Sequence, residues 1–223
     1  MTRCFACLLL LSACDQTATV TFPIGAEVDF SADELGLPMD LRADDGTVRT
    51  LACGPMGMCP STSEAPVTCE GSVCNPAPQM VSTQVGDVID VDELASDVEA
   101  LFGEIDSLEV LSVDYQVDRN TLTFPVEPID IYWGPVSAVD IDEEMGVRLF
   151  GTVPALPAGT AGNGAVAIDA AGSAALTEFF ETTSHQFRFF ARTRVDLEPG
   201  EAWPEGTLSV AVRMSVRVSG SLL

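Results

Sequence analysis

The sequence contains no lysine and a single histidine, His185, and these absences exclude several kinds of chemistry. Without lysine there is no side chain to form a Schiff base and no P-loop lysine to hold a phosphate. A Ser-His-Asp or Cys-His site would have to use His185, and no Gly-x-Ser-x-Gly segment accompanies it. His185 directly precedes a predicted strand, which is typical of a solvated turn. We therefore expect a non-enzymatic protein without a cofactor.

Basic residues are scarce, because 10 arginines face 34 acidic residues and give a formal net charge of −24. Binding to nucleic acid needs cationic side chains that displace the counterions of the phosphates, so we expect no nucleic-acid partner. Charged residues nevertheless make up only 20% of the chain and hydrophobic residues 47%. That balance favours a folded globular chain over disorder.

Clusters of acidic residues are expected by chance in so acidic a chain. The runs at 87–93 and 140–144 offer carboxylate oxygens of the kind that calcium prefers. Neither run has the spacing of an EF-hand or its central glycine. Paired carboxylates of the glycosidase type are equally unspecific here. We expect no bound metal.

The apolar run at 5–11 is far shorter than the about 20 residues that a membrane-spanning helix needs. It follows Arg3 and precedes small residues, a pattern typical of an export signal. The next four residues, Leu11-Ser12-Ala13-Cys14, resemble the lipobox of bacterial lipoproteins at all four positions. The resemblance implies that 1–13 is a cleaved signal peptide, that Cys14 is acylated, and that 14–16 is a short tether to the membrane. The alternative is an ordinary secretory signal with a cysteine there by chance.

Four further cysteines remain after cleavage, because only Cys4 and Cys7 lie in the signal segment. They are Cys53, Cys59, Cys69 and Cys74. All four fall in a loop at about 52–80 that is also rich in proline and glycine, which disfavour regular helix and strand. An even set of cysteines in an exported protein predicts two disulfides, with three possible connectivities. Zinc is the alternative, but the gaps of five, nine and four residues match the usual ligand spacing only once.

Alternation of apolar and polar residues predicts strands through most of the remaining chain. The candidates are 17–24, with Pro23 indicating an edge strand, then 47–51, then 113–117 and 122–126 joined by a turn at 118–120, and finally 187–195 and 208–218. Helical spacing of Leu94, Val98, Leu101 and Ile105 predicts a helix over 92–105, and a second, short helix is expected at 173–182. We predict one mainly β domain over 17–223, an antiparallel β-sandwich or open barrel with one or two short helices and a disulfide-tied loop.

The positive charge is concentrated near the C-terminus, where five arginines accompany four acids from His185 onward. These are Arg188, Arg192, Arg194, Arg213 and Arg217. Pro and Gly residues within 196–207 predict a turn that makes the last two strands antiparallel neighbours, with Arg188, Arg192 and Arg213 in one exposed patch. The ordinary interpretation is a solvated face that pairs with acids on adjacent strands. The alternative is a site for an anion such as a phosphate, a lipid head group or an acidic glycan.

These features together predict a lipoprotein of the bacterial cell envelope, anchored through acyl chains on Cys14 to the periplasmic side of a membrane or to the cell surface. A non-enzymatic role follows, in which the β domain binds an envelope protein or has a structural function. The alternative is a lipid- or glycan-binding protein that uses the sandwich interior or the arginine-bearing face.

Overall fold

The computed structural model describes residues 16–31, 35–63, 65–91 and 102–222. The fold is mainly β, as the sequence predicts, with three antiparallel sheets, one α-helix and a disulfide-tied loop among these residues. The strands are β1 (Gln16–Ser31), β2 (Val67–Glu70), β3 (Val73–Pro76), β4 (Gln79–Asp90), β5 (Phe102–Asn120), β6 (Ile129–Pro135), β7 (Arg148–Val153), β8 (Gly162–Ala165), β9 (Ala167–Ile168), β10 (Gln186–Val195) and β11 (Glu205–Leu222). The helices are α3 (Ala170–Thr182) and the 3-10 turns η1 (Met39–Leu41), η2 (Pro55–Gly57) and η3 (Glu143–Met145).

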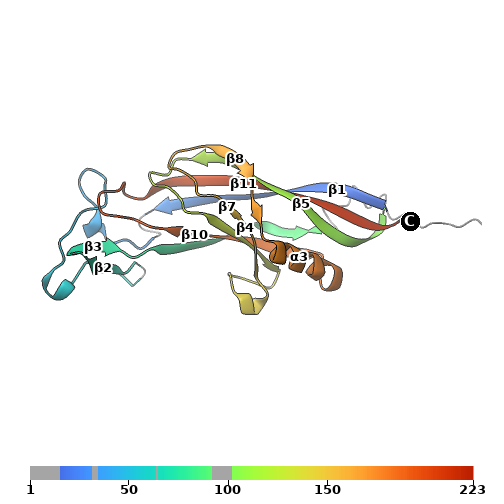
Figure 1. Ribbon diagram of the computed structural model, residues 1–223, viewed down its shortest axis with the longest axis horizontal. Helices are drawn as coiled ribbons and strands as arrows, with labels where there is room; N and C mark the ends of the chain where they lie inside the picture. Colours follow the sequence, from blue (N-terminus) through green and yellow to red (C-terminus); the bar gives the residue numbers. More distant parts are fainter. Residues whose placement is uncertain (1–15, 32–34, 64, 92–101, 223) are drawn as a thin grey trace, which may run out of the picture.

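Two of the sheets form a sandwich along the long axis of the molecule (Figure 1). The first has the strand order β1-β11-β5-β8 and the second the order β4-β10-β6-β7-β9. In the first sheet β1 pairs with β11 in an unbroken antiparallel register from Gln16 opposite Gly220 to Ser31 opposite Glu205. As its proline predicts, β1 is an edge strand.

Alternation along β10 and β11 builds the core between the sheets. In both strands the side chains that point inward are buried. They include Phe187 and Phe189 on β10 and Met214 and Val216 on β11. Phe189 also contacts Phe150 of β7 edge to face, with ring centroids 5.3 Å apart. Because alternate residues of a strand point to opposite faces, the polar rows of these strands lie on the outside of the sandwich.

The helix α3 confirms the prediction of a short helix near 173–182. Asp169 caps it, accepting a hydrogen bond from the backbone N–H of Gly172 at 2.7 Å. Gly172 is needed for the close approach to β7, because a Cβ there would lie 1.6 Å from the carbonyl oxygen of Leu149. The indole Nε1 of Trp133 donates to the Gly172 carbonyl at 2.9 Å, which fixes the helix against β6.

Several sequence predictions in this region differ from the structure or lie partly outside the described residues. The helix expected over 92–105 lies outside the described residues from 92 to 101, and 102–105 already belong to β5, where Phe102 pairs with Leu222 and Ile105 with Gly220. Pairing with the long strand β11 outweighs the local helical spacing there. The turn expected at 118–120 is also strand, because Asn120 still pairs with Leu208.

The returning strand expected at 122–126 is instead an irregular segment. Leu122, Phe124 and Val126 are buried as the alternation predicts. Pro125, however, lacks an N–H for a ladder, and the segment forms an isolated bridge from Val126 to Leu156 and a backbone hydrogen bond from Thr123 to Glu205. The strand expected at 47–51 is likewise reduced to isolated bridges. No helix among the described residues has the length and apolarity needed to cross a bilayer.

Candidate functional site

The four cysteines of the predicted loop form two disulfides, Cys53–Cys69 and Cys59–Cys74. Cys69 and Cys74 are carried by the hairpin β2–β3, whose two-residue turn has positive φ at Gly71 (57°) and Ser72 (72°). Positive φ at both central positions is the type I′ turn, whose twist matches that of the strands. The bridges therefore fasten the segment 53–59 onto this hairpin. The sulfurs of Cys53, Cys59 and Cys74 lie within 4.8 Å of one another, but disulfide sulfurs are not the thiolates that zinc binds.

The disulfide-tied loop packs at one end of the sandwich, and β1 begins at the other (Figure 1). The segment before the loop bonds to the β10–β11 connection, where Val48 N–H donates to the Glu201 carbonyl and Trp203 N–H to the Gly46 carbonyl. At the opposite end Gln16 pairs with Gly220. We call the first the stapled end, comprising 35–63, 65–80 and 196–205, and the second the Gln16 end.

The stapled end exposes several large apolar side chains. Met56 is 94% exposed, and Met39, Met58 and Met80 are 57%, 58% and 62% exposed. Met80 stands at the start of β4 opposite Arg194. Methionine is flexible and polarisable, and it is common on surfaces that adapt to different partners.

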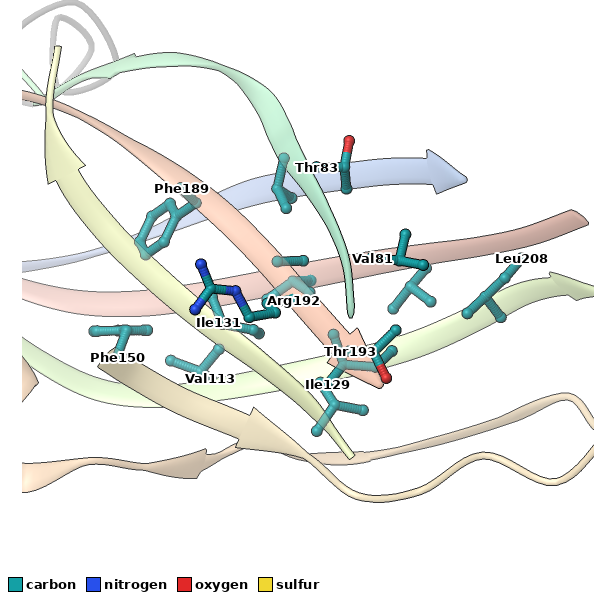
Figure 2. Close-up of a pocket in the computed structure, with 15 residues that line it drawn as sticks. Val81, Thr83, Val113, Ile129, Ile131, Phe150, Phe189, Arg192, Thr193 and Leu208 are labelled. Carbon is teal, nitrogen blue, oxygen red and sulfur yellow. The ribbon is translucent and has the colours of Figure 1, made fainter. Parts of the chain in front are cut away.

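A small cavity lies between the two main sheets (Figure 2). Its volume is about 60 Å³, and its walls are almost wholly apolar, with Val81 and Val85 from β4, Phe189 from β10 and Leu208 and Val212 from β11 among them. The hydroxyl of Thr193 in its wall already donates to the carbonyl oxygen of Glu127 at 3.0 Å. The space holds no array of free polar groups.

Arg188, Arg192 and Arg213 do not form the single patch that the sequence predicts. Strand β10 lies in one main sheet and β11 in the other, so the expected antiparallel pairing of these two strands is wrong. The connection over 196–207 carries the chain from one layer of the sandwich to the other. Because the apolar rows of both strands face the shared core, Arg188, Arg192 and Arg194 lie on one outer face and Arg213 and Arg217 on the opposite one.

Four of these five arginines have partners within the protein. Arg217 Nη1 donates to Glu109 Oε2 at 2.6 Å, and Arg194 Nη2 to Asp196 Oδ2 at 2.7 Å. Arg188 Nη1 donates to the amide oxygen of Gln84 at 3.1 Å. Arg192 lies over the ring of Tyr132, with its guanidinium carbon 5.4 Å from the centroid. The ordinary interpretation, pairing with an acid on an adjacent strand, describes Arg217. The acid that pairs with Arg194 follows its own strand, and Arg188 and Arg192 contact neutral side chains.

The fifth, Arg213, has no hydrogen bond or ion pair with any residue in the described part of the chain. It lies beside a groove of about 430 Å³ on the outer face of β5, β8 and β11. Asp114 stands directly opposite Arg213 in the β5–β11 register. The amides of Gln116 and Asn163 complete the polar groups of the groove.

No pattern in the sequence points to Asp114, Gln116 and Asn163 as site residues. Their positions on the outer row of β5 and on β8 are set by pairing of strands far apart in the chain, Asp114 with Ala165 and Gln116 with Asn163. The segment Gly162-Asn163-Gly164 is too short and too rich in glycine to be recognised as a strand from its pattern.

His185 and the acidic run at 140–144 make contacts within the fold. The ring of His185 stacks on Phe180, with centroids 4.1 Å apart and planes 11° apart. Its side chain is half-buried. In the run 140–144, Asp142 Oδ1 accepts a hydrogen bond from Glu144 N–H at 2.8 Å and so caps η3. Part of the run 87–93 lies outside the described residues.

No protein-family model and no curated protein matches the sequence. Among solved structures, the chain is similar to one described as Desmodium yellow mottle tymovirus, with 8% sequence identity and a TM-score of 0.33, over 100% of this chain and 91% of that chain. It is also similar to a chain from a structure of infectious bursal disease virus Gx strain, with 12% identity and a TM-score of 0.29, over 92% of this chain and 52% of that chain. At such TM-scores the similarity assigns neither a family nor a function.

Proposed function

We propose that the protein is a lipoprotein of the bacterial cell envelope, anchored through acyl chains on Cys14, whose β-sandwich binds an envelope partner without catalysis. The motif Leu11-Ser12-Ala13-Cys14 carries this proposal. The two disulfides support it independently, because structural disulfides persist in oxidising compartments outside the cytosol.

The position of β1 supports a defined orientation of the anchored domain. Only Asp15 separates Cys14 from Gln16 in the sequence, and two residues span at most about 7 Å. The acyl chains would therefore hold the Gln16 end against the membrane. Since β1 has 16 residues, the stapled end would stand about 50 Å farther out.

The stapled end is, in this orientation, the surface best placed to meet a partner. It is the part of the domain farthest from the anchoring membrane, its backbone is held by two disulfides, and its exposed methionines offer adaptable apolar contacts. A backbone that the disulfides already hold in place loses less conformational entropy when it binds a partner.

Binding of a lipid in the sandwich interior, one form of the alternative function, has less support. The cavity of about 60 Å³ falls well below the roughly 300–1,000 Å³ of typical small-molecule sites. The arginines, divided between two faces, do not offer one large cationic surface.

The anchor is tested by replacing Cys14 with Ser in the full chain. We expect Cys14→Ser to abolish labelling by a fatty-acid analogue and to release the protein from the membrane fraction. Cys7→Ser, within the segment that processing would remove, is the matched control and should leave both unchanged. Labelling that persists in Cys14→Ser would overturn the proposal.

The partner surface is tested by crosslinking in intact cells. A crosslink to an envelope protein through a photoreactive residue at position 56 should be lost when Met39, Met58 and Met80 are replaced by Ser. Met145→Ser serves as the control, because Met145 is 40% exposed on η3, outside the stapled end. An unchanged crosslink in the triple variant would place the partner surface elsewhere.

A further inference from the structure

Two opposite charges stand face to face on the outer surface of the first sheet without binding each other. Arg213 of β11 lies directly opposite Asp114 of β5. Arg213 has no hydrogen-bond or ion-pair partner among the described residues, and Asp114 accepts only a long hydrogen bond of 3.5 Å from Ser112 Oγ. Arg217 lies four residues farther along the same outer row of β11. It forms an ion pair with Glu109, the residue opposite it on β5, at an N–O distance of 2.6 Å. Register alone therefore does not explain why Arg213 and Asp114 stay apart.

The groove between these residues is shaped by small side chains. Its lining combines the small residues Ala211, Gly164 and Ala165 with the longer side chains of Arg213, Asp114, Gln116 and Asn163. Ala165 lies opposite Asp114 in the β5–β8 register, on the outer row. The resulting groove of about 430 Å³ is within the size range of small-molecule sites, unlike the interior cavity.

Another polar hollow, on the outer face of the second sheet, differs in how its arginines are engaged. It has a similar volume, about 460 Å³, and contains Arg192, Arg194 and Asp196. There Arg194 binds Asp196 and Arg192 lies over Tyr132, so both arginines are already engaged. In the groove beside Arg213 the charges are available to a ligand.

We propose that this groove binds a zwitterionic amino-carboxylate group, with the ligand carboxylate on Arg213 and its ammonium on Asp114. A guanidinium can donate two parallel hydrogen bonds to a carboxylate, and an ammonium donates to a carboxylate oxygen. The amides of Gln116 and Asn163 supply further donors and acceptors. A simple anion would be disfavoured by Asp114 and by the net charge of −24, whereas a zwitterion meets both signs of the site.

The location of the groove selects the source of the ligand, and this step rests on the proposed lipid anchor. Arg213 pairs with Pro23 of β1, seven residues from Gln16, so the groove lies about 23 Å from the Gln16 end. The head groups of the anchoring membrane would not reach it. The ligand is therefore a free amino-carboxylate, or one displayed on a polymer of the envelope, rather than a zwitterionic lipid.

Saturation-transfer difference NMR on the detergent-solubilised full chain tests the proposal, with 6-aminohexanoate as the probe and hexanoate and pentylamine as single-charge analogues. We expect saturation of 6-aminohexanoate and little of either analogue. Arg213→Gln and Asp114→Asn should each weaken binding at least about tenfold, as loss of a charge-assisted hydrogen bond does. Arg217 lies on the same face but is paired with Glu109. The control variant Arg217→Gln should therefore bind 6-aminohexanoate as tightly as the unchanged protein does.

Three outcomes would overturn the inference. They are no saturation of 6-aminohexanoate, binding of hexanoate as tight as that of 6-aminohexanoate, or a loss of affinity in Arg217→Gln as large as that in Arg213→Gln. Binding to phosphatidylethanolamine vesicles that Arg213→Gln abolishes would assign the site to a lipid head group and overturn the choice of source. Membrane labelling through Cys14 does not depend on Arg213, so failure of this inference and failure of the proposed anchor are separable.

Discussion

Cys69 and Cys74 lie directly opposite each other in the β2–β3 hairpin, yet they do not form a disulfide with each other. Each reaches instead to a cysteine 15 or 16 residues earlier in the chain, Cys59 or Cys53. A bridge across the hairpin would have closed only a short loop. The observed pairing holds down a long segment that has little secondary structure of its own.

Removing one bridge by the double replacement Cys53→Ser and Cys69→Ser should lower the free energy of unfolding by about 3 kcal/mol, as expected for a closed loop of this size. Denaturant unfolding of the oxidised protein measures the change. Thiol counting under denaturing, non-reducing conditions should find no free thiol among the four cysteines before replacement. Two or more free thiols, or equal stability of the double variant, would contradict the pairing.

Gly172→Ala should destabilise the protein by several kcal/mol, because its Cβ would meet the Leu149 carbonyl and push α3 from β7. Gly162→Ala is the matched control, since nothing lies within 4 Å of a Cβ there. Thermal unfolding followed by circular dichroism compares the two. A shift in Gly162→Ala as large as that in Gly172→Ala would show that the close approach is not the cause.

The ion pair of Arg217 and Glu109 is solvent-exposed, so its contribution to stability should be small. A double-mutant cycle with Arg217→Gln and Glu109→Gln should give a coupling free energy of about 0.2–1 kcal/mol. The coupling should shrink at high salt, because exposed charges are screened. A coupling that is insensitive to salt would refute an electrostatic origin.

The side chain and the backbone N–H of Thr47 both donate to Asp45 Oδ1, at 2.7 and 3.2 Å. These bonds lower the pKa of the Asp45 carboxyl below its ordinary value of 3.8. Because the pKa of Asp45 is lower in the folded state, its ionised carboxylate stabilises the fold at pH values above the unfolded-state pKa. This contribution to stability is lost as the pH falls through the folded-state pKa. Thr47→Val should raise the Asp45 pKa in an NMR titration, while Thr50→Val should leave it unchanged.

Local patterns in the sequence predict the inner rows of the sandwich well. The alternation at 187–195 and 208–218 identifies two real strands with their buried faces, and the helix near 173–182 is found at α3. What alternation cannot specify is the partner of a strand. Whether β10 and β11 pair or lie in different layers depends on the connection over 196–204, which packs against 46–48 rather than forming a tight turn.

The groove of Arg213 is missed for a related reason. Its residues come from three strands, and the small side chains of Ala211 and Ala165 matter as much as the charges. A search for clusters along the chain finds charged runs, but it does not find a hollow made by small residues on different strands. The cysteines are the opposite case, because their clustering within one loop is visible in the sequence itself.

The unbroken ladder of β1 and β11 has a mechanical consequence. Its hydrogen bonds run perpendicular to the strands, and 16 residue pairs follow one another without a bulge. A pull between Cys14 and Glu205, the first residue of β11, acts along the strands, so it loads these bonds together in shear instead of opening them one after another. A domain tethered at Gln16 and gripped at its far end would thus resist extension along its length far better than peeling from its side.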